Sequence, residues 1–202
     1  MAYSNFTLDR IREELGVENQ RTKILTDFEP VVPSDKLVKE LQEVEELPIR
    51  SEKAKSEWIV VPILKELRNR NNKYFTIYSG DVLIADEEKG LKGECDFILA
   101  KDIGTFDINY PIIQIVEAKK NDVELGVPQC AAQLIGAKIY NEKKGVKLDK
   151  IYGCVTTGNE WLFMKFEDDC IEINTKVYYL IEIDNILGIF QWIINFYINE
   201  LK

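Results

Sequence analysis

The sequence predicts an α/β protein in which helices flank a mixed central sheet. Segments of helical and β-strand character follow one another along the chain: a helix, three strands, a helix and then further strands. Residues 111–119 (PIIQIVEAK) are apolar almost to the end, which is typical of a central strand buried on both faces. The 202 residues, 46% of them hydrophobic, are enough for one domain with a sizeable core.

Residues 1–50 are expected to form a helical N-terminal arm that packs on the main domain, residues 51–202, or on the second subunit of a homodimer. One helix is predicted over residues 8–15. Another is predicted over residues 34–46, because Ser34 can cap its start and a proline follows its end.

The main domain is predicted to begin with a helix over residues 51–68, whose first turn Ser51 can cap. Pro62 lies within this helix and removes one of its backbone hydrogen bonds, which costs roughly 3 kcal/mol in a straight helix. We therefore expect a bend or break at Pro62. Three strands follow, over residues 74–85, 94–100 and 111–119.

A long helix is predicted over residues 127–142, with Pro128 in its first turn and Gly145 beyond its end. The rest of the chain is predicted to form strands over residues 151–156, 161–166, 171–173 and 178–183, and a helix over residues 185–201. The most apolar run of the chain, residues 186–198, is too short and too interrupted to span a bilayer, and the N-terminus has no apolar signal core. We expect a soluble cytoplasmic protein without a membrane partner.

The absence of histidine restricts the chemistry open to this chain. It excludes Ser-His-Asp and Cys-His nucleophile systems and histidine-ligated metal hydrolases, so catalysis falls to carboxylates, lysines and a hard metal ion. The four cysteines are isolated and predict buried thiols rather than a zinc site or disulfides. The net charge of −9 argues against a surface that coats nucleic acid. Only residues 119–150 are net positive, and their lysines are candidates to offset phosphate charge.

Charged residues end the third predicted strand. Side chains two apart on a strand share a face, so Glu117 and Lys119 point the same way, and the Ala118 carbonyl stays available. On the preceding strand, Asp96 is an acid next to an apolar run, whereas Glu94 is expected to be a solvated turn residue. If the two strands are adjacent, the two carboxylates and the carbonyl form a hard oxygen site suited to Mg²⁺ or Mn²⁺, with Lys119 beside it.

With these residues the chain resembles the PD-(D/E)XK nuclease superfamily of restriction-endonuclease-like proteins, whose Asp…Glu-x-Lys motif maps onto Asp96, Glu117 and Lys119. The superfamily core of a helix, three strands, a helix and a further strand matches residues 51–160. The chain is also similar to an uncharacterised bacterial family of that type, through segments such as SEKAKSEWIVVPILKEL, IVEAKK and IYGCVTTGNEW. The resemblance implies a three-layer sandwich with helices on both sides of the sheet.

The resemblance also implies roles for the motif residues. A divalent metal ion would be held by Asp96, Glu117 and the Ala118 carbonyl, where it would polarise the scissile phosphate and activate a water molecule. Lys119 would position that water or stabilise the transition state. A role as a base is less favoured, because two neighbouring carboxylates raise the pKa of a lysine.

Further site residues are expected on the two helices that flank these strands. The superfamily often adds a glutamate from the first helix, and Glu52 ranks ahead of Glu57 for this role. The alternative for Glu52 is a favourable acid at a helix N-terminus, and for Glu57 a surface residue. Gln129 and Gln133 share the helix face that the superfamily turns toward the site, and Gln133 is the stronger candidate because apolar residues surround it.

The function that these observations predict is a Mg²⁺-dependent endonuclease or exonuclease that hydrolyses phosphodiester bonds in nucleic acid, with DNA as the first candidate. A second hypothesis keeps the fold but makes the protein a catalytically silent binding or assembly module. A third treats the motif as a coincidence and the chain as an interaction domain that uses its N-terminal arm and C-terminal helix.

Overall fold

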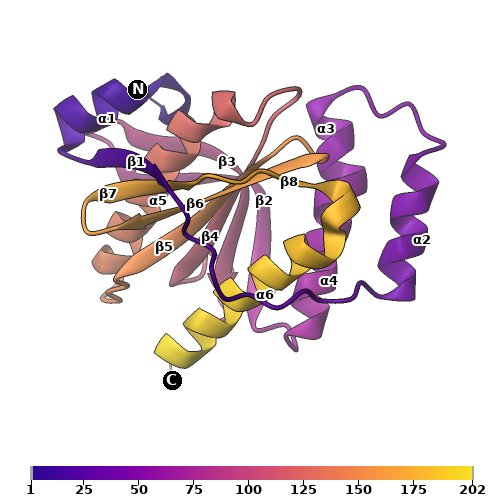
Figure 1. Ribbon diagram of the computed structural model, residues 1–202. Coiled ribbons are helices and arrows are strands. Elements are labelled where there is room, and N and C mark those ends of the chain that lie inside the picture. The colour runs from indigo at the N-terminus through magenta and orange to yellow at the C-terminus, as the bar shows by residue number, and fades with distance from the viewer. Residues whose placement is uncertain (1, 202) are drawn as a thin grey trace.

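An open mixed β-sheet forms the centre of the protein, and helices pack against both of its faces (Figure 1). The computed structural model describes residues 2–201. The strands are β1 (Glu18–Thr22), β2 (Phe75–Asp86), β3 (Leu91–Lys101), β4 (Ile112–Ala118), β5 (Lys150–Thr156), β6 (Glu160–Glu167), β7 (Cys170–Asn174) and β8 (Tyr178–Tyr179). Their order in the sheet is β1-β7-β6-β5-β4-β3-β2, and β8 pairs with β6 off this path. The pairs β1–β7 and β4–β5 are parallel and the other pairs are antiparallel.

The helices surround this sheet. They are α1 (Leu8–Leu15), α2 (Asp35–Val44), α3 (Glu52–Lys55), α4 (Val61–Arg70), α5 (Val127–Lys143) and α6 (Ile183–Glu200). Single turns are the 3₁₀ turns η1 (Tyr3–Asn5), η3 (Glu124–Gly126) and η4 (Leu180–Glu182) and the π-helical turn η2 (Ser56–Val60). The expected α/β architecture with a mixed sheet packed against helices is therefore confirmed.

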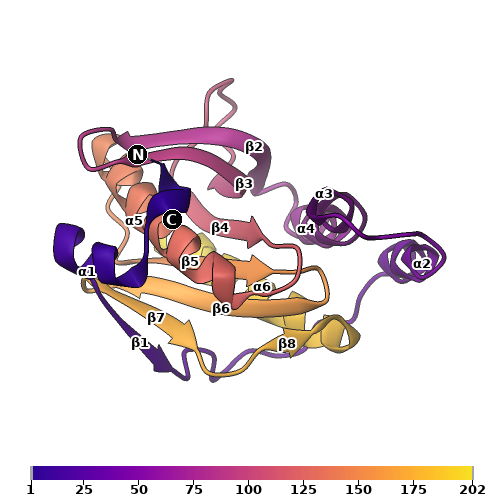
Figure 2. The same cartoon turned by 90° about the horizontal axis from the view of Figure 1, so that it is seen from above.

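The two faces of the sheet carry different helices (Figure 2). On β5, Gly153 faces α5, because a Cβ atom there would lie 2.9 Å from the Cys130 sulfur. The preceding residue, Tyr152, faces the other way and packs edge-on against Trp192 of α6. Helix α1 joins α5 on the first face, and α4 joins α6 on the second. The central strand β4, which leads into the candidate site, is buried along its whole length.

The sequence suggested a purely helical N-terminal arm, but the arm also contains a strand. Its helices α1 and α2 are present, but residues 18–22 between them form β1, an edge strand parallel to β7. The sequence ENQRT shows no alternation of apolar and polar residues. This edge strand has no buried face, and its backbone pairing with β7 holds it in the sheet. The arm also packs tightly on the main domain, since Tyr3, Ile11 and Leu37 are all at most 1% exposed.

The predicted first helix of the main domain is interrupted by η2. Ser51 caps its start, because its hydroxyl accepts a hydrogen bond of 3.0 Å from the Ala54 amide. The Val61 amide then donates to the Ser56 carbonyl, five residues back, and Pro62 follows in the first turn of α4. The break expected at the proline is thus a widened turn immediately before it.

The strand predicted over residues 178–183 is largely wrong. Only Tyr178 and Tyr179 form a strand, and the chain then turns through η4 into α6. The Glu182 carboxylate accepts a hydrogen bond from the Tyr179 amide and so starts the helical turn, which overrides the β preference of the intervening apolar residues. Among residues 2–201, none of the helices combines the length and apolar character that crossing a membrane requires.

Candidate active site

The charged end of β4 is the centre of the candidate site. Pairing with β5 continues one residue past the strand, because the Lys119 amide donates to the Thr156 carbonyl at 2.8 Å. The Lys119 ammonium nitrogen lies 2.6 Å from Oε1 of Glu117. The two side chains therefore lie on the same side of the sheet, as their spacing predicts.

Glu117 is a buried carboxylate, only 1% exposed. Its second oxygen, Oε2, accepts a hydrogen bond of 2.8 Å from the side-chain amide of Gln133 on α5. Burial and the charge of Asp96 raise the pKa of Glu117 to about 7, although Lys119 and Gln133 oppose that shift. Sequence analysis singled out Gln133, and its position explains the preference: it contacts the central acid of the site.

Asp96, in the middle of β3, contacts the end of β4. Regular pairing between these strands ends at Phe97 and Val116, and beyond that point Oδ2 of Asp96 accepts a hydrogen bond of 2.7 Å from the Ala118 amide. The Asp96 carboxylate thus accepts the hydrogen bond that a backbone carbonyl of β3 would accept if regular pairing with β4 continued. This contact fixes Asp96 beside Glu117.

Lys119 is held between these acids and α5. Burial lowers its pKa, but the surrounding carboxylates, led by Glu117 and including Asp96 and Glu52, outweigh burial and raise the pKa above its ordinary value. The ammonium group is therefore charged at neutral pH. Its nitrogen also donates to Oε1 of Gln129 at 3.3 Å.

Gly126 is a site residue that sequence reasoning missed. A Cβ atom at this position would lie 2.5 Å from Cγ1 of Val155 and 3.0 Å from Cγ of Lys119. Only glycine therefore lets the start of α5 approach β5 and the Lys119 side chain this closely. The available signal was a glycine directly before the predicted helix start at residue 127.

A cavity of about 360 Å³ opens in front of these residues. It is lined by Asp96, Glu117, Lys119 and Gln129, and also by Glu52 at the start of α3. Glu57, the other candidate from the first helix, does not line this cavity. It is exposed, and its carboxylate lies 3.8 Å from the Lys53 ammonium.

The N-terminal turn η1 contributes a wall of the cavity, which the sequence did not indicate. Ala2, Tyr3 and Ser4 all line it. The Tyr3 hydroxyl donates to the Leu91 carbonyl at 3.1 Å, and its ring packs so closely on α5 that a Cβ at Gly136 would lie 2.3 Å from the hydroxyl oxygen. Glu94, expected to be a solvated turn residue, is exposed but also lines the cavity.

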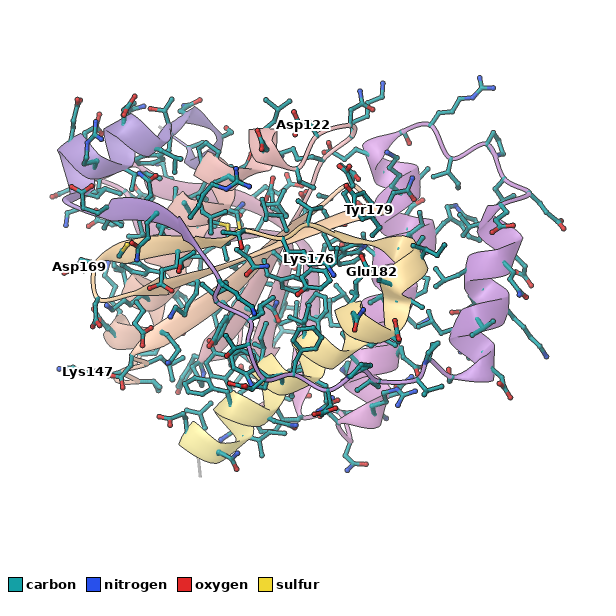
Figure 3. The ribbon with its side chains drawn as sticks, in the orientation of Figure 1. Asp122, Lys147, Asp169, Lys176, Tyr179 and Glu182 are labelled. Carbon is teal, nitrogen blue, oxygen red and sulfur yellow. The ribbon has the colours of Figure 1, made fainter. Side chains whose placement is uncertain are left out.

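The basic residues of segment 119–150 divide between two ends of the molecule. Lys143, at the end of α5, is about 20 Å from Gln129 along the helix, because each helical residue advances the chain by about 1.5 Å. Figure 3 shows this separation: Asp122, shortly after β4, and Lys147, shortly after α5, lie at opposite ends. The lysines at the far end of α5 therefore fit the alternative interpretation of this segment, a solvated helix face, whereas Lys119 and Lys120 lie next to β4.

The oxygen atoms at the cavity fit a small hard cation. Mg²⁺ typically takes one or two protein carboxylates and completes its shell with water and phosphate oxygens, and Asp96 and Glu117 supply two carboxylates. Within the part of the chain that the structure describes, no three or more Asp, Glu or Cys side chains are grouped to hold a metal ion. Oε1 of Gln133 is buried beside Glu117 without a hydrogen-bond partner among the described residues, so a further polar acceptor lies next to the carboxylate pair.

Two comparisons of the sequence, with protein families and with curated proteins, identified no relative. No protein-family model matches the sequence. No curated protein shows significant similarity to it. The functional conclusion therefore depends on the fold and on the geometry of the site.

Proposed function

We propose that this protein is a metal-dependent nuclease that hydrolyses phosphodiester bonds, with DNA as its substrate and Mg²⁺ or Mn²⁺ as its cofactor. The observation that carries the proposal is the convergence of Asp96, Glu117, Lys119 and Glu52 on one cavity. These are the residues of the Asp…Glu-x-Lys motif together with the preferred acid of the first helix, although they are spread over nearly seventy positions of the sequence.

The fold supports the same proposal. In chain order, α4, β2, β3, β4, α5 and β5 give a helix, three strands, a helix and a strand, with the three strands antiparallel and β5 parallel to β4. We infer that this is the restriction-endonuclease-like core of a three-layer sandwich. Glu117 and Lys119 stand at the end of the third strand, and Asp96 lies on the second strand where its pairing with the third ends, which is where that core has its catalytic centre.

Each side chain has a separable role in the proposed reaction. Asp96 and Glu117, held by the Ala118 amide and by Gln133, present oxygen ligands to the cation. When bound, a divalent cation polarises the scissile phosphate and promotes formation of the attacking hydroxide. Lys119 orients the attacking water and stabilises negative charge on the phosphate, since a lysine that stays protonated cannot act as a base. Glu52 extends the polar wall of the cavity.

A nuclease panel tests this function. Single-stranded and duplex DNA and RNA are incubated with the protein in Mg²⁺, in Mn²⁺ and in chelator, and cleavage is followed on gels. We expect metal-dependent cleavage that falls by about 10²–10³-fold in Asp96→Asn and in Lys119→Met, the size of effect seen when one group that stabilises a transition state is lost. Glu43→Gln is the control, because Glu43 is an exposed acid on α2 that does not line the candidate site; it should retain activity within about twofold.

The same panel separates the nuclease from the silent module. Intact nucleic acid under every condition, with Asp96→Asn indistinguishable from the wild type, would contradict the proposal. Calorimetric titration with Mn²⁺ then identifies the alternative, because a silent module shows no binding that Glu117→Gln abolishes.

A further inference from the structure

The candidate active site continues into a second cavity. This neighbour, of about 350 Å³, lies between the α3–η2 segment and the β2–β3 hairpin. The two cavities share Glu52, Glu94 and Asp96, so they adjoin, and together they are called the trench here, with Glu117 and Lys119 at one end of it. Gly80 and Ser79 of β2 line the second part, and Gly80 adopts a φ of +72° that favours glycine.

The trench has fixed walls at both ends. At the first cavity, η1 is anchored by Tyr3, which is 1% exposed and packs against both Gly93 of β3 and Gly136 of α5. At the second cavity, α3 is tied to the loop after β4, because the Lys55 ammonium donates to the Lys120 carbonyl. Each cavity has the volume of a site for one small organic molecule rather than the surface of a macromolecular groove.

The charge of the trench limits how many phosphates it can hold. Five carboxylates line it against the two ammonium groups of Lys53 and Lys119, a net charge of −3. One divalent cation reduces this only to about −1, so attraction for phosphate is confined to the cation and the nearby Lys119 ammonium, which together can contact one or two phosphates. Duplex DNA carries one negative charge per roughly 1.7 Å of its axis, so a bound duplex would bring many more phosphates against acidic walls. The carboxylates in question are Glu52, Glu57, Glu94, Asp96 and Glu117.

We propose that the trench takes a single, flexible strand of nucleic acid, including a frayed end, and excludes intact duplex. This inference rests on the proposed nuclease function. One nucleotide occupies the cavity with Glu117 and Lys119, and its neighbour occupies the cavity between α3 and β2. The wall formed by η1 contributes to this preference, because it occupies one side of the cavity that holds Glu117 and Lys119 and so limits the room for a second strand.

The first test compares one labelled oligonucleotide alone and in a blunt-ended duplex, with Mg²⁺ or Mn²⁺. We expect the single strand to be cut at least about tenfold faster, because strand separation costs a few kcal/mol before a duplex can enter. Binding of the single strand should weaken only about 3- to 7-fold between 50 and 200 mM salt, as expected for one or two phosphate contacts.

A second measurement examines the wall itself. Tyr3→Ala removes the anchor of η1, so the ratio of duplex to single-strand cleavage should rise at least severalfold. Tyr3→Phe keeps the ring and loses only the hydrogen bond to Leu91, and it should stay close to the wild type. Leu37→Ala, which removes a buried side chain on α2 away from the trench, controls for loss of stability and should leave the ratio unchanged.

The outcomes distinguish this inference from the proposed function. Equal cleavage of duplex and single strand, or a salt dependence of many contacts, overturns the single-strand preference and leaves the nuclease standing. An unchanged ratio in folded Tyr3→Ala overturns the role of the wall. Absence of cleavage on every substrate overturns the nuclease function, and the substrate preference fails with it.

Discussion

Glu117 combines burial with a functional position, and this combination makes it a source of instability. Its pKa is raised to about 7 by burial and by Asp96, so the folded state holds a proton more tightly than the unfolded chain does. Between the ordinary pKa of a glutamate and about pH 7, stability therefore falls as pH rises. The ionised carboxylate is tolerated because Lys119 and Gln133 contact it.

Glu117→Gln should consequently stabilise the protein at pH 8 in metal-free buffer, because the amide resembles the protonated acid. We expect a gain of about 1–2 kcal/mol, or roughly 2–8 °C in Tm. At pH 5 the wild-type side chain is protonated, so the difference should shrink toward zero. Thermal melts followed by circular dichroism at the two pH values measure it. A variant that is less stable than the wild type at pH 8 would show that the ion pair with Lys119 outweighs the burial of the charge.

Packing between α5 and the sheet positions the site at the scale of whole elements. The helix begins immediately after Gly126, and its first turns bring Gln129 to Lys119 and Gln133 to Glu117. The two glutamines lie four residues apart, so their side chains share one face of α5, and this face contacts both Lys119 and Glu117. The distance between helix and strand is therefore as important to the site as the identity of its residues.

Gly126→Ala tests this distance. The added methyl group meets Val155 and the Lys119 side chain, so we expect a loss of about 1–3 kcal/mol of stability, as in other overpacked cores, and a displaced lysine. Cleavage per folded molecule should fall at least about tenfold, because small displacements of a positioned group are costly.

Gly153→Ala is the matched control for that variant. Its methyl group would lie 2.9 Å from the Cys130 sulfur, so it also overpacks α5 against β5, but it does not contact Lys119. It should lose stability and keep its activity per folded molecule. Equal loss of activity in both variants would contradict a specific role for Gly126.

Elements with a strong local signal were predictable from the sequence. Helix α1 has the bounds expected for it, α5 ends one residue later than expected, and β4 was identified by its apolar run. Strand β1 was not, because its polar sequence carries no apolar pattern and its partner strand lies far along the chain. The motif residues and both glutamines could be selected from the sequence by spacing and residue type together with the family resemblance. Gly126 and Tyr3 could not, because what they contribute is close packing between distant segments.

At the scale of the whole molecule, the N-terminal arm is part of the main structure. Its buried side chains belong to the common core, and η1 closes the candidate site. Six hydrophobic residues of the arm are buried: Tyr3, Phe6, Ile11, Val17, Leu25 and Leu37. Burial of each contributes about 1.5–3 kcal/mol, and their sum is comparable with the total stability of a typical domain.

A fragment of residues 51–202 should therefore not fold cooperatively by itself. Urea unfolding followed by tryptophan fluorescence should show a broad transition of low midpoint for the fragment and a sharp one for the full chain. Adding a peptide of residues 1–50 should restore part of the cooperativity. A sharp, full-chain-like transition of the fragment alone would instead establish it as an independent domain.

The pairing of β1 with β7 also has a consequence for how the protein is made. Gln20 and Glu172, which contact each other across these strands, are separated by 152 positions in the chain. At a synthesis rate of about 5–20 residues per second, the ribosome releases the second roughly 8–30 s after the first. During that interval the N-terminal strand has no partner, and chaperones have an unpaired segment to protect. The sheet is completed only after β7 has been synthesised, so a ribosome that stalls before β7 leaves a chain that lacks this edge of the sheet.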